Sequence, residues 1–85
     1  MDIKEIITVT NKFLVEEFEA NPADITPEAN LKSTLDLDSL DYIDMVVVIE
    51  DNFGFKVKPE DFQAIITFQD FYDYVTARVQ QKELV

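Results

Sequence analysis

The apolar residues of this chain recur at the spacing of amphipathic helices, beginning with its first residues. Near the start of the chain, the apolar side chains at helical spacing are Ile3, Ile6, Ile7, Phe13, Leu14 and Phe18. Asp2 stands before them with Glu5 three residues later, which is the spacing of an N-terminal capping box. Asn21 and Pro22 follow as helix stop signals. We therefore predict a first helix over residues 3–19.

Three further helices are predicted after a long connection. Residues 21–38 are weakly patterned, and we expect a loop there that three leucines attach to the core, Leu31, Leu35 and Leu37. Residues 39–53 form the second predicted helix. Pro59 and the two acids after it predict a short third helix to about residue 65, because proline and negative charge favour a helix start. Thr67 is a candidate N-cap for a fourth helix, whose apolar positions are Phe68, Phe71, Tyr72, Val75 and Val79.

Together these elements predict an all-α fold, a small four-helix bundle in which one helix is short. The 85 residues are expected to form one domain, residues 1–85, and the single Gly argues against a many-stranded β fold. The chain has no Cys and no His, which excludes disulfides and thiolate metal sites and removes the commonest general base. Its longest apolar run, residues 45–49, is too short to span a bilayer, so we expect a cytoplasmic protein. We also expect it to be a monomer.

The charge of the chain indicates which partners it can have. Eighteen acids stand against seven bases, for a net charge of −11. Such a surface repels nucleic acid and anionic lipid and attracts basic proteins, with association rates that fall as salt rises. The acids are concentrated as well as numerous, because residues 33–55 hold six acids and no base.

The helix predicted over residues 39–53 has two apolar faces. At about 100° per residue, one face collects a core stripe of Tyr42, Met45, Val46, Ile49 and Phe53. The opposite face mixes aliphatic and acidic side chains: Leu40, Ile43, Asp44, Val47, Glu50 and Asp51. Either Ile43 and Val47 contact the 21–38 segment or the third helix, or this face is a docking surface with apolar anchors inside a charged rim. The mixture of both residue types on one face favours docking.

Ser39, at the start of this helix, has several possible roles. Either Asp38 or Ser39 can be the N-cap. A hydrolase nucleophile is disfavoured, because there is no His to activate the hydroxyl and no glycine pair of a nucleophile elbow around it. A calcium loop beginning at Asp36 also fails, because the positions that need an oxygen ligand, Gly and Glu hold Leu40, Asp41 and Val47. No metal site is therefore predicted.

The sequence around Ser39 resembles the attachment motif of acyl carrier proteins. Leu37-Asp38-Ser39-Leu40-Asp41 is similar to their Asp-Ser-Leu motif at a helix start, and the likeness continues through residues 42–46, 49–54, 57–61 and 67–75. The three-residue motif alone has low specificity, but motif, register, size and acidity agree over nearly the whole chain. The resemblance implies a bundle of acyl-carrier type that is not an enzyme. It also implies that a phosphopantetheinyl transferase moves 4′-phosphopantetheine from CoA onto Ser39, which supplies the thiol that the chain lacks.

The resemblance also assigns roles to other positions. Asp38 matches the motif acid, which helps engage the modifying enzyme and its metal. The family's partner-recognition helix maps onto Leu40, Asp41, Ile43, Asp44, Val47, Glu50 and Asp51, where enzymes that make and transfer acyl chains would bind with basic patches. The helix core and acyl pocket map onto Met45, Val46, Ile49, Val57, Phe62, Ile65 and Phe68. Phe62 is larger than the residue often found at its position, which leaves the pocket depth open.

The cargo pathway is less closely indicated than the carrier role. Asp36-Leu37 stands before Asp-Ser-Leu, where many fatty-acid carriers have Gly-Ala. We expect carriage of acyl thioesters in fatty acid biosynthesis. Polyketide, aryl-polyene and aminoacyl or peptidyl carriage remain alternatives. From a different class, an unmodified acidic helical adaptor remains a rival, in which Ser39 would be only part of the helix start.

Overall fold

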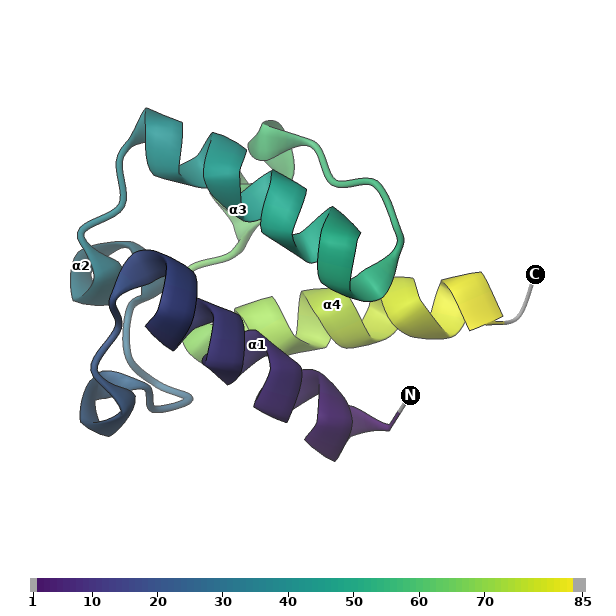
Figure 1. The fold of residues 1–85 in the computed structure, drawn as a ribbon, viewed down its shortest axis with the longest axis horizontal. Helices are drawn as coiled ribbons and strands as arrows, with labels where there is room; N and C mark the ends of the chain where they lie inside the picture. Colours follow the sequence, from purple (N-terminus) through teal and green to yellow (C-terminus); the bar gives the residue numbers. More distant parts are fainter. Residues whose placement is uncertain (1, 84–85) are drawn as a thin grey trace.

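The computed structural model describes residues 2–83 of the chain. Within them the chain forms α-helices and short 3-10 helices in the order α1 (Ile3–Phe18), η1 (Pro22–Asp24), α2 (Leu31–Leu35), α3 (Ser39–Phe53), η2 (Pro59–Ala64) and α4 (Phe68–Glu83). The first and last helices pack against each other and run in opposite directions, and α3 lies above this pair in the view of Figure 1. This confirms the all-α bundle. No helix in this part of the chain combines the length and apolarity needed to cross a membrane.

The predicted helix starts are confirmed at both ends of the bundle. The Glu5 N–H donates to the Asp2 carboxylate at 2.9 Å, so Asp2 caps α1. At α4, the Asp70 N–H donates to the Thr67 hydroxyl at 3.1 Å, and the Asp70 carboxylate accepts from the Thr67 N–H at 3.2 Å. The same carboxylate also accepts from the Ile66 N–H at 3.2 Å. The hydrogen bond from the Thr67 main chain, and then that from Ile66, lower the pKa of Asp70 because they favour its charged form.

The predicted loop over residues 21–38 contains two short helices that the sequence analysis missed. The Asn21 and Asn30 side chains cap η1 and α2, accepting from the Ala23 and Ser33 N–H groups at 3.0 and 2.8 Å. Main-chain hydrogen bonds then fasten the segment to the start of α4, from Leu31 N–H to Ile66 O and from Phe68 N–H to Ala29 O. Helices of three and five residues are too short to show an apolar period.

A dense aromatic core holds the bundle together. The Phe13 ring lies 6.4 Å from both Phe53 and Phe71, which joins α1, α3 and α4. Of the three leucines expected to attach the 21–38 segment, Leu31 and Leu37 are buried and Leu35 packs half-buried against the core. The short third helix is present as the 3-10 helix η2, and its Phe62 reaches inward to Phe71. The buried side of α3 is therefore packed against the rest of the bundle.

Candidate functional site

The start of α3 is fixed by Asp38, which is its N-cap. One carboxylate oxygen of Asp38 accepts from the N–H groups of Leu40 and Asp41 at 2.9 and 3.0 Å. The Asp41 carboxylate accepts in return from the Asp38 N–H at 3.0 Å, which completes a capping box. Of the two candidates for the cap, the structure thus selects Asp38.

Ser39 is the first residue of α3 and is exposed. Because Asp38 caps the helix, the Ser39 hydroxyl has no structural role there, and it makes no hydrogen bond with any residue between 2 and 83. A phosphate attached to this oxygen would fit sterically, since the side chain faces solvent. It would not bind the Leu40 and Asp41 N–H groups, which are already bonded to Asp38. These two N–H groups therefore leave a phosphate at Ser39 without a main-chain hydrogen bond from the first turn of α3.

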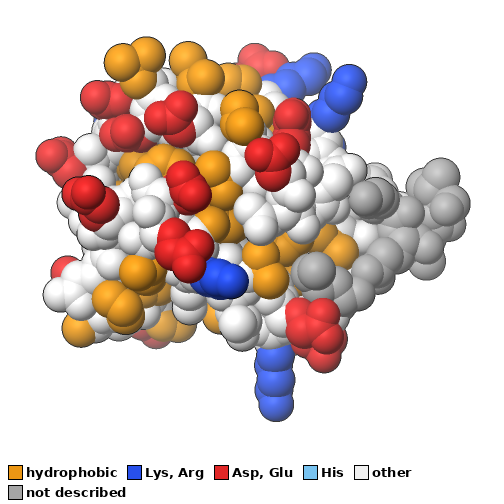
Figure 2. Space-filling view, in the orientation of Figure 1, with side chains coloured by type: hydrophobic (Ala, Val, Ile, Leu, Met, Phe, Trp, Pro, Cys, Tyr) orange, Lys and Arg blue, Asp and Glu red, His pale blue; other side chains and the backbone are white. Residues whose placement is uncertain are grey.

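The second apolar face of α3 is open to solvent. Leu40 is 71% exposed, and Ile43 and Val47 are each 52% exposed. About half of the surface of Ile43 and of Val47 therefore reaches solvent, so neither side chain is buried beneath the 21–38 segment or the third helix. The acids predicted beside them share this surface, since Asp44 and Asp51 are exposed and Asp41 and Glu50 are half-buried. Figure 2 shows acidic and hydrophobic side chains interspersed over the part of the surface where Figure 1 places α3.

A groove extends this surface towards the end of α1. It has a volume of about 470 Å³ and is lined by Glu17, Phe18, Asp44, Val47, Val48, Asp51 and Asn52. From the sequence, α1 was predicted only as a core helix, and its contribution to this surface was not predicted. The signal was present in the three acids that cluster around the C-terminal end of that helix, Glu16, Glu17 and Glu19. The exposed acidic and apolar surface thus spans two helices.

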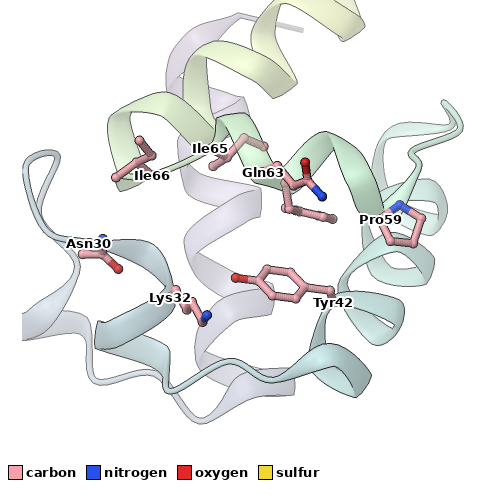
Figure 3. Close-up of a pocket in the computed structure, with 8 residues that line it drawn as sticks. Asn30, Lys32, Tyr42, Pro59, Gln63, Ile65 and Ile66 are labelled. Atoms are coloured by element: carbon pink, nitrogen blue, oxygen red, sulfur yellow. The ribbon is translucent and has the colours of Figure 1, made fainter.

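A separate pocket of about 420 Å³ lies between α2, the first turn of α3 and the η2 segment (Figure 3). Its lining consists of Asn30, Lys32, Tyr42, Pro59, Phe62, Gln63, Ile65 and Ile66. Of the residues expected at an acyl pocket, only Phe62 and Ile65 line it. The other expected residues do not line this pocket. Val46 is half-buried against the core, and four are buried in it, namely Met45, Ile49, Val57 and Phe68.

Tyr42 is the lining residue closest in sequence to Ser39. It lies three residues further along α3, which is about 4.5 Å along the helix axis. Its ring crosses the pocket with the hydroxyl towards Lys32 (Figure 3). A tyrosine phenol is neutral at physiological pH, and burial raises the pKa of Tyr42 further above its ordinary value. Within residues 2–83, no group of three or more carboxylates converges as a metal site.

Comparison with known proteins identifies the family. Residues 12–75 match the phosphopantetheine attachment site family. Acyl carrier protein 2 of Ralstonia nicotianae is 38% identical over 66 residues, which cover 78% of this chain and 82% of the relative. Acyl carrier proteins of Rubrobacter xylanophilus and Thermosynechococcus vestitus are 29% and 27% identical, over 88% and 93% of this chain and 93% and 98% of theirs. The chain therefore belongs to the phosphopantetheine-dependent acyl carrier proteins, which are carriers and not enzymes.

Proposed function

We propose that Ser39 is the attachment residue and that the chain delivers acyl thioesters from this point to its partner enzymes. The observation that supports this is the division of roles at the start of α3. Asp38 carries out the capping, so the hydroxyl of its exposed neighbour is available for modification. A serine that capped the helix would lose its hydrogen bond on modification, whereas modification of Ser39 costs the helix nothing that the structure shows.

The attachment step requires little from this chain beyond presentation of the hydroxyl. The Ser39 oxygen forms a bond to the phosphorus of the pantetheine phosphate in CoA, and the pyrophosphate bond breaks to release adenosine 3′,5′-bisphosphate. The serine proton passes to a general base, for which this chain offers no His. When attached, the arm supplies the thiol on which acyl groups are carried.

Partner enzymes are proposed to bind the mixed face of α3. Leu40, Ile43 and Val47 would be the apolar anchors, since each keeps more than half of its surface exposed. The surrounding acids, together with Glu17 across the groove, would pair with basic patches on the transferase and on acyl-transferring enzymes. Fatty acid synthesis remains the expected pathway, with polyketide, aryl-polyene and aminoacyl or peptidyl carriage as alternatives. The single domain over residues 1–85, the monomeric state and the cytoplasmic location likewise remain predictions.

Intact-mass measurement tests the attachment residue. The chain is incubated with CoA, Mg²⁺ and a broad-specificity phosphopantetheinyl transferase, alongside Ser39→Ala and Ser33→Ala. Ser33 is the only other serine, so its variant is a matched control. We expect one phosphopantetheine on the parent and on Ser33→Ala, and none on Ser39→Ala. A mass gain on Ser39→Ala would overturn the assignment, and no gain on any folded protein would favour an unmodified acidic adaptor.

Charge reversal tests the docking face. Asp44→Lys combined with Asp51→Lys changes two exposed acids on α3, and Asp24→Lys combined with Glu28→Lys makes the same charge change on exposed residues outside it. Both double variants leave the capping box of Asp38 and Asp41 intact. At low salt we expect transferase loading to slow by about tenfold for the α3 pair, with a much smaller change for the control pair. Equal slowing by both pairs would indicate general electrostatic attraction and no defined docking face.

A further inference from the structure

The pocket beside the first turn of α3 bears on the cargo, on the basis of the attachment proposed at Ser39. Its volume of about 420 Å³ lies near the lower end of the range for small-molecule pockets, roughly 300–1,000 Å³. Tyr42 places one wall within a single helical turn of Ser39. A group carried on a flexible arm at Ser39 can therefore fold back to this pocket.

An aromatic pair closes the inner side of the pocket. The rings of Tyr42 and Phe62 lie 5.2 Å apart, one from α3 and the other from η2. Phe62 in turn lies 6.2 Å from Phe71, which is fully buried. Behind this layer, Met45 and Phe68 are also 0% exposed. Close-packed protein interiors do not admit further methylene groups without displacing side chains, so a chain in the pocket meets this buried aromatic layer.

The wall of the pocket is also poorly suited to a long saturated chain. Four of its eight lining side chains are polar: Asn30, Lys32, Tyr42 and Gln63. Covering polar groups with methylenes removes them from water without a replacement hydrogen bond, which is unfavourable. A short acyl group can lie on Phe62, Ile65 and Ile66 and leave the polar groups hydrated.

We propose that Tyr42 and Phe62 set a length limit on the acyl group that this carrier shelters. Cargo of a few carbons fits between η2 and the first turn of α3. The carbons of a longer saturated chain extend into solvent, because the aromatic pair separates the pocket from the core. The substrate class sheltered here is therefore a short acyl thioester, and a long fatty acyl intermediate on the same arm would stay exposed to solvent.

Thioester protection across a series of chain lengths tests the limit. Acetyl, butyryl, hexanoyl, octanoyl and decanoyl groups are loaded from their CoA thioesters by the transferase, and cleavage by hydroxylamine is followed by intact mass. If an acyl chain enters an apolar core, each further pair of buried methylenes lowers the fraction of carrier whose acyl chain is exposed to solvent by roughly tenfold. For the parent we expect protection to stop growing beyond butyryl or hexanoyl. Protection that continues to grow through decanoyl would overturn the proposal.

Variants identify whether the aromatic pair is the cause. Phe62→Leu and Tyr42→Thr replace the two rings by smaller side chains. Phe55→Leu makes the same kind of change at a buried ring that does not line the pocket. We expect octanoyl protection to increase by about tenfold for the two pocket variants and to stay at the parent level for Phe55→Leu. If all three resemble the parent, the pair does not set the limit. If the folded parent protein is not loaded at all, attachment at Ser39 is refuted instead. The attachment proposal and the length-limit proposal can therefore fail separately.

Discussion

Substitution of Asp38 by alanine should weaken α3 while leaving Ser39 in place. The Asp38 carboxylate is the only side-chain partner that the structure shows for the Leu40 and Asp41 N–H groups. Asp38→Ala removes both hydrogen bonds and the negative charge at the positive end of the helix dipole. The reciprocal bond from the Asp38 main-chain N–H to Asp41 uses no atom of the Asp38 side chain, so alanine retains it.

The size of the loss follows from the position of the cap. Replacing a capping residue by alanine costs between about 0.5 and 2 kcal/mol. Asp38 and Leu40 are exposed, so water can reach the two N–H groups once the carboxylate is gone. We therefore expect a loss near the middle of that range, about 1 kcal/mol. For a domain of this size, that lowers the midpoint of thermal unfolding by roughly 4–8 °C.

Two matched variants separate capping from attachment. Asp38→Asn keeps an oxygen acceptor at the cap and should stay within about 0.5 kcal/mol of the parent, although it loses the charge offered to the modifying enzyme. Ser39→Ala removes a hydroxyl with no partner and should also stay within about 0.5 kcal/mol. The expected order of stability is therefore parent, Asp38→Asn and Ser39→Ala close together, with Asp38→Ala clearly below them.

Urea unfolding followed by circular dichroism at 222 nm, in parallel with transferase loading, measures both properties. Asp38→Ala should be less stable than Ser39→Ala, and only Ser39→Ala should completely lose loading. If Ser39→Ala were destabilised as much as Asp38→Ala, the division of roles between the two residues would be refuted. Equal stability of Asp38→Ala and the parent would refute the magnitude worked out from the capping box.

Three residues far from Ser39 in the sequence, Gly54, Tyr72 and Tyr74, give further expectations. Gly54→Ala forces a side chain onto the α3 C-cap, where φ is 76°, and should cost about 1–2 kcal/mol; an unchanged urea midpoint would contradict this. Tyr72→Phe removes the 2.6 Å hydrogen bond from the Tyr72 hydroxyl to Asn11 and should cost about 1 kcal/mol in the same assay. Burial, and then the hydrogen bond to Asp61, raises the pKa of Tyr74 from 10.0 to about 12. The unfolded chain therefore loses this proton first, and stability should fall between about pH 10 and 12, less steeply in Tyr74→Phe.

The long helices could be predicted from the sequence because their apolar periods are long. The predicted range 39–53 is the observed extent of α3, and the predicted first helix differs from α1 by one residue. Glu19, predicted as the last helical residue, is instead the C-cap, in the left-handed region at φ 57°. The two short helices before α3 could not be found in this way. They depend on asparagine caps and on main-chain bonds to the start of α4, which are tertiary contacts.

The functional site was predictable in part. Helical periodicity separated the exposed Ile43 and Val47 from the buried Met45 and Ile49, and the structure bears out that division. Periodicity indicates which side of a helix faces inward, but it does not indicate which inward residues border a gap. Tyr42 was therefore placed in the core stripe, although it lines the pocket, and the contribution of Lys32 was not anticipated.

The main-chain bonds between the 21–38 segment and the start of α4 also make the walls of the pocket unequal. They join Leu31 to Ile66 and Phe68 to Ala29, so the Asn30 and Ile66 sides of the pocket are held together. The opposite side is η2, a 3-10 helix, whose hydrogen-bond geometry is weaker than that of an α-helix. The wall that carries Phe62 therefore has weaker main-chain hydrogen bonding than the wall that is joined to the start of α4.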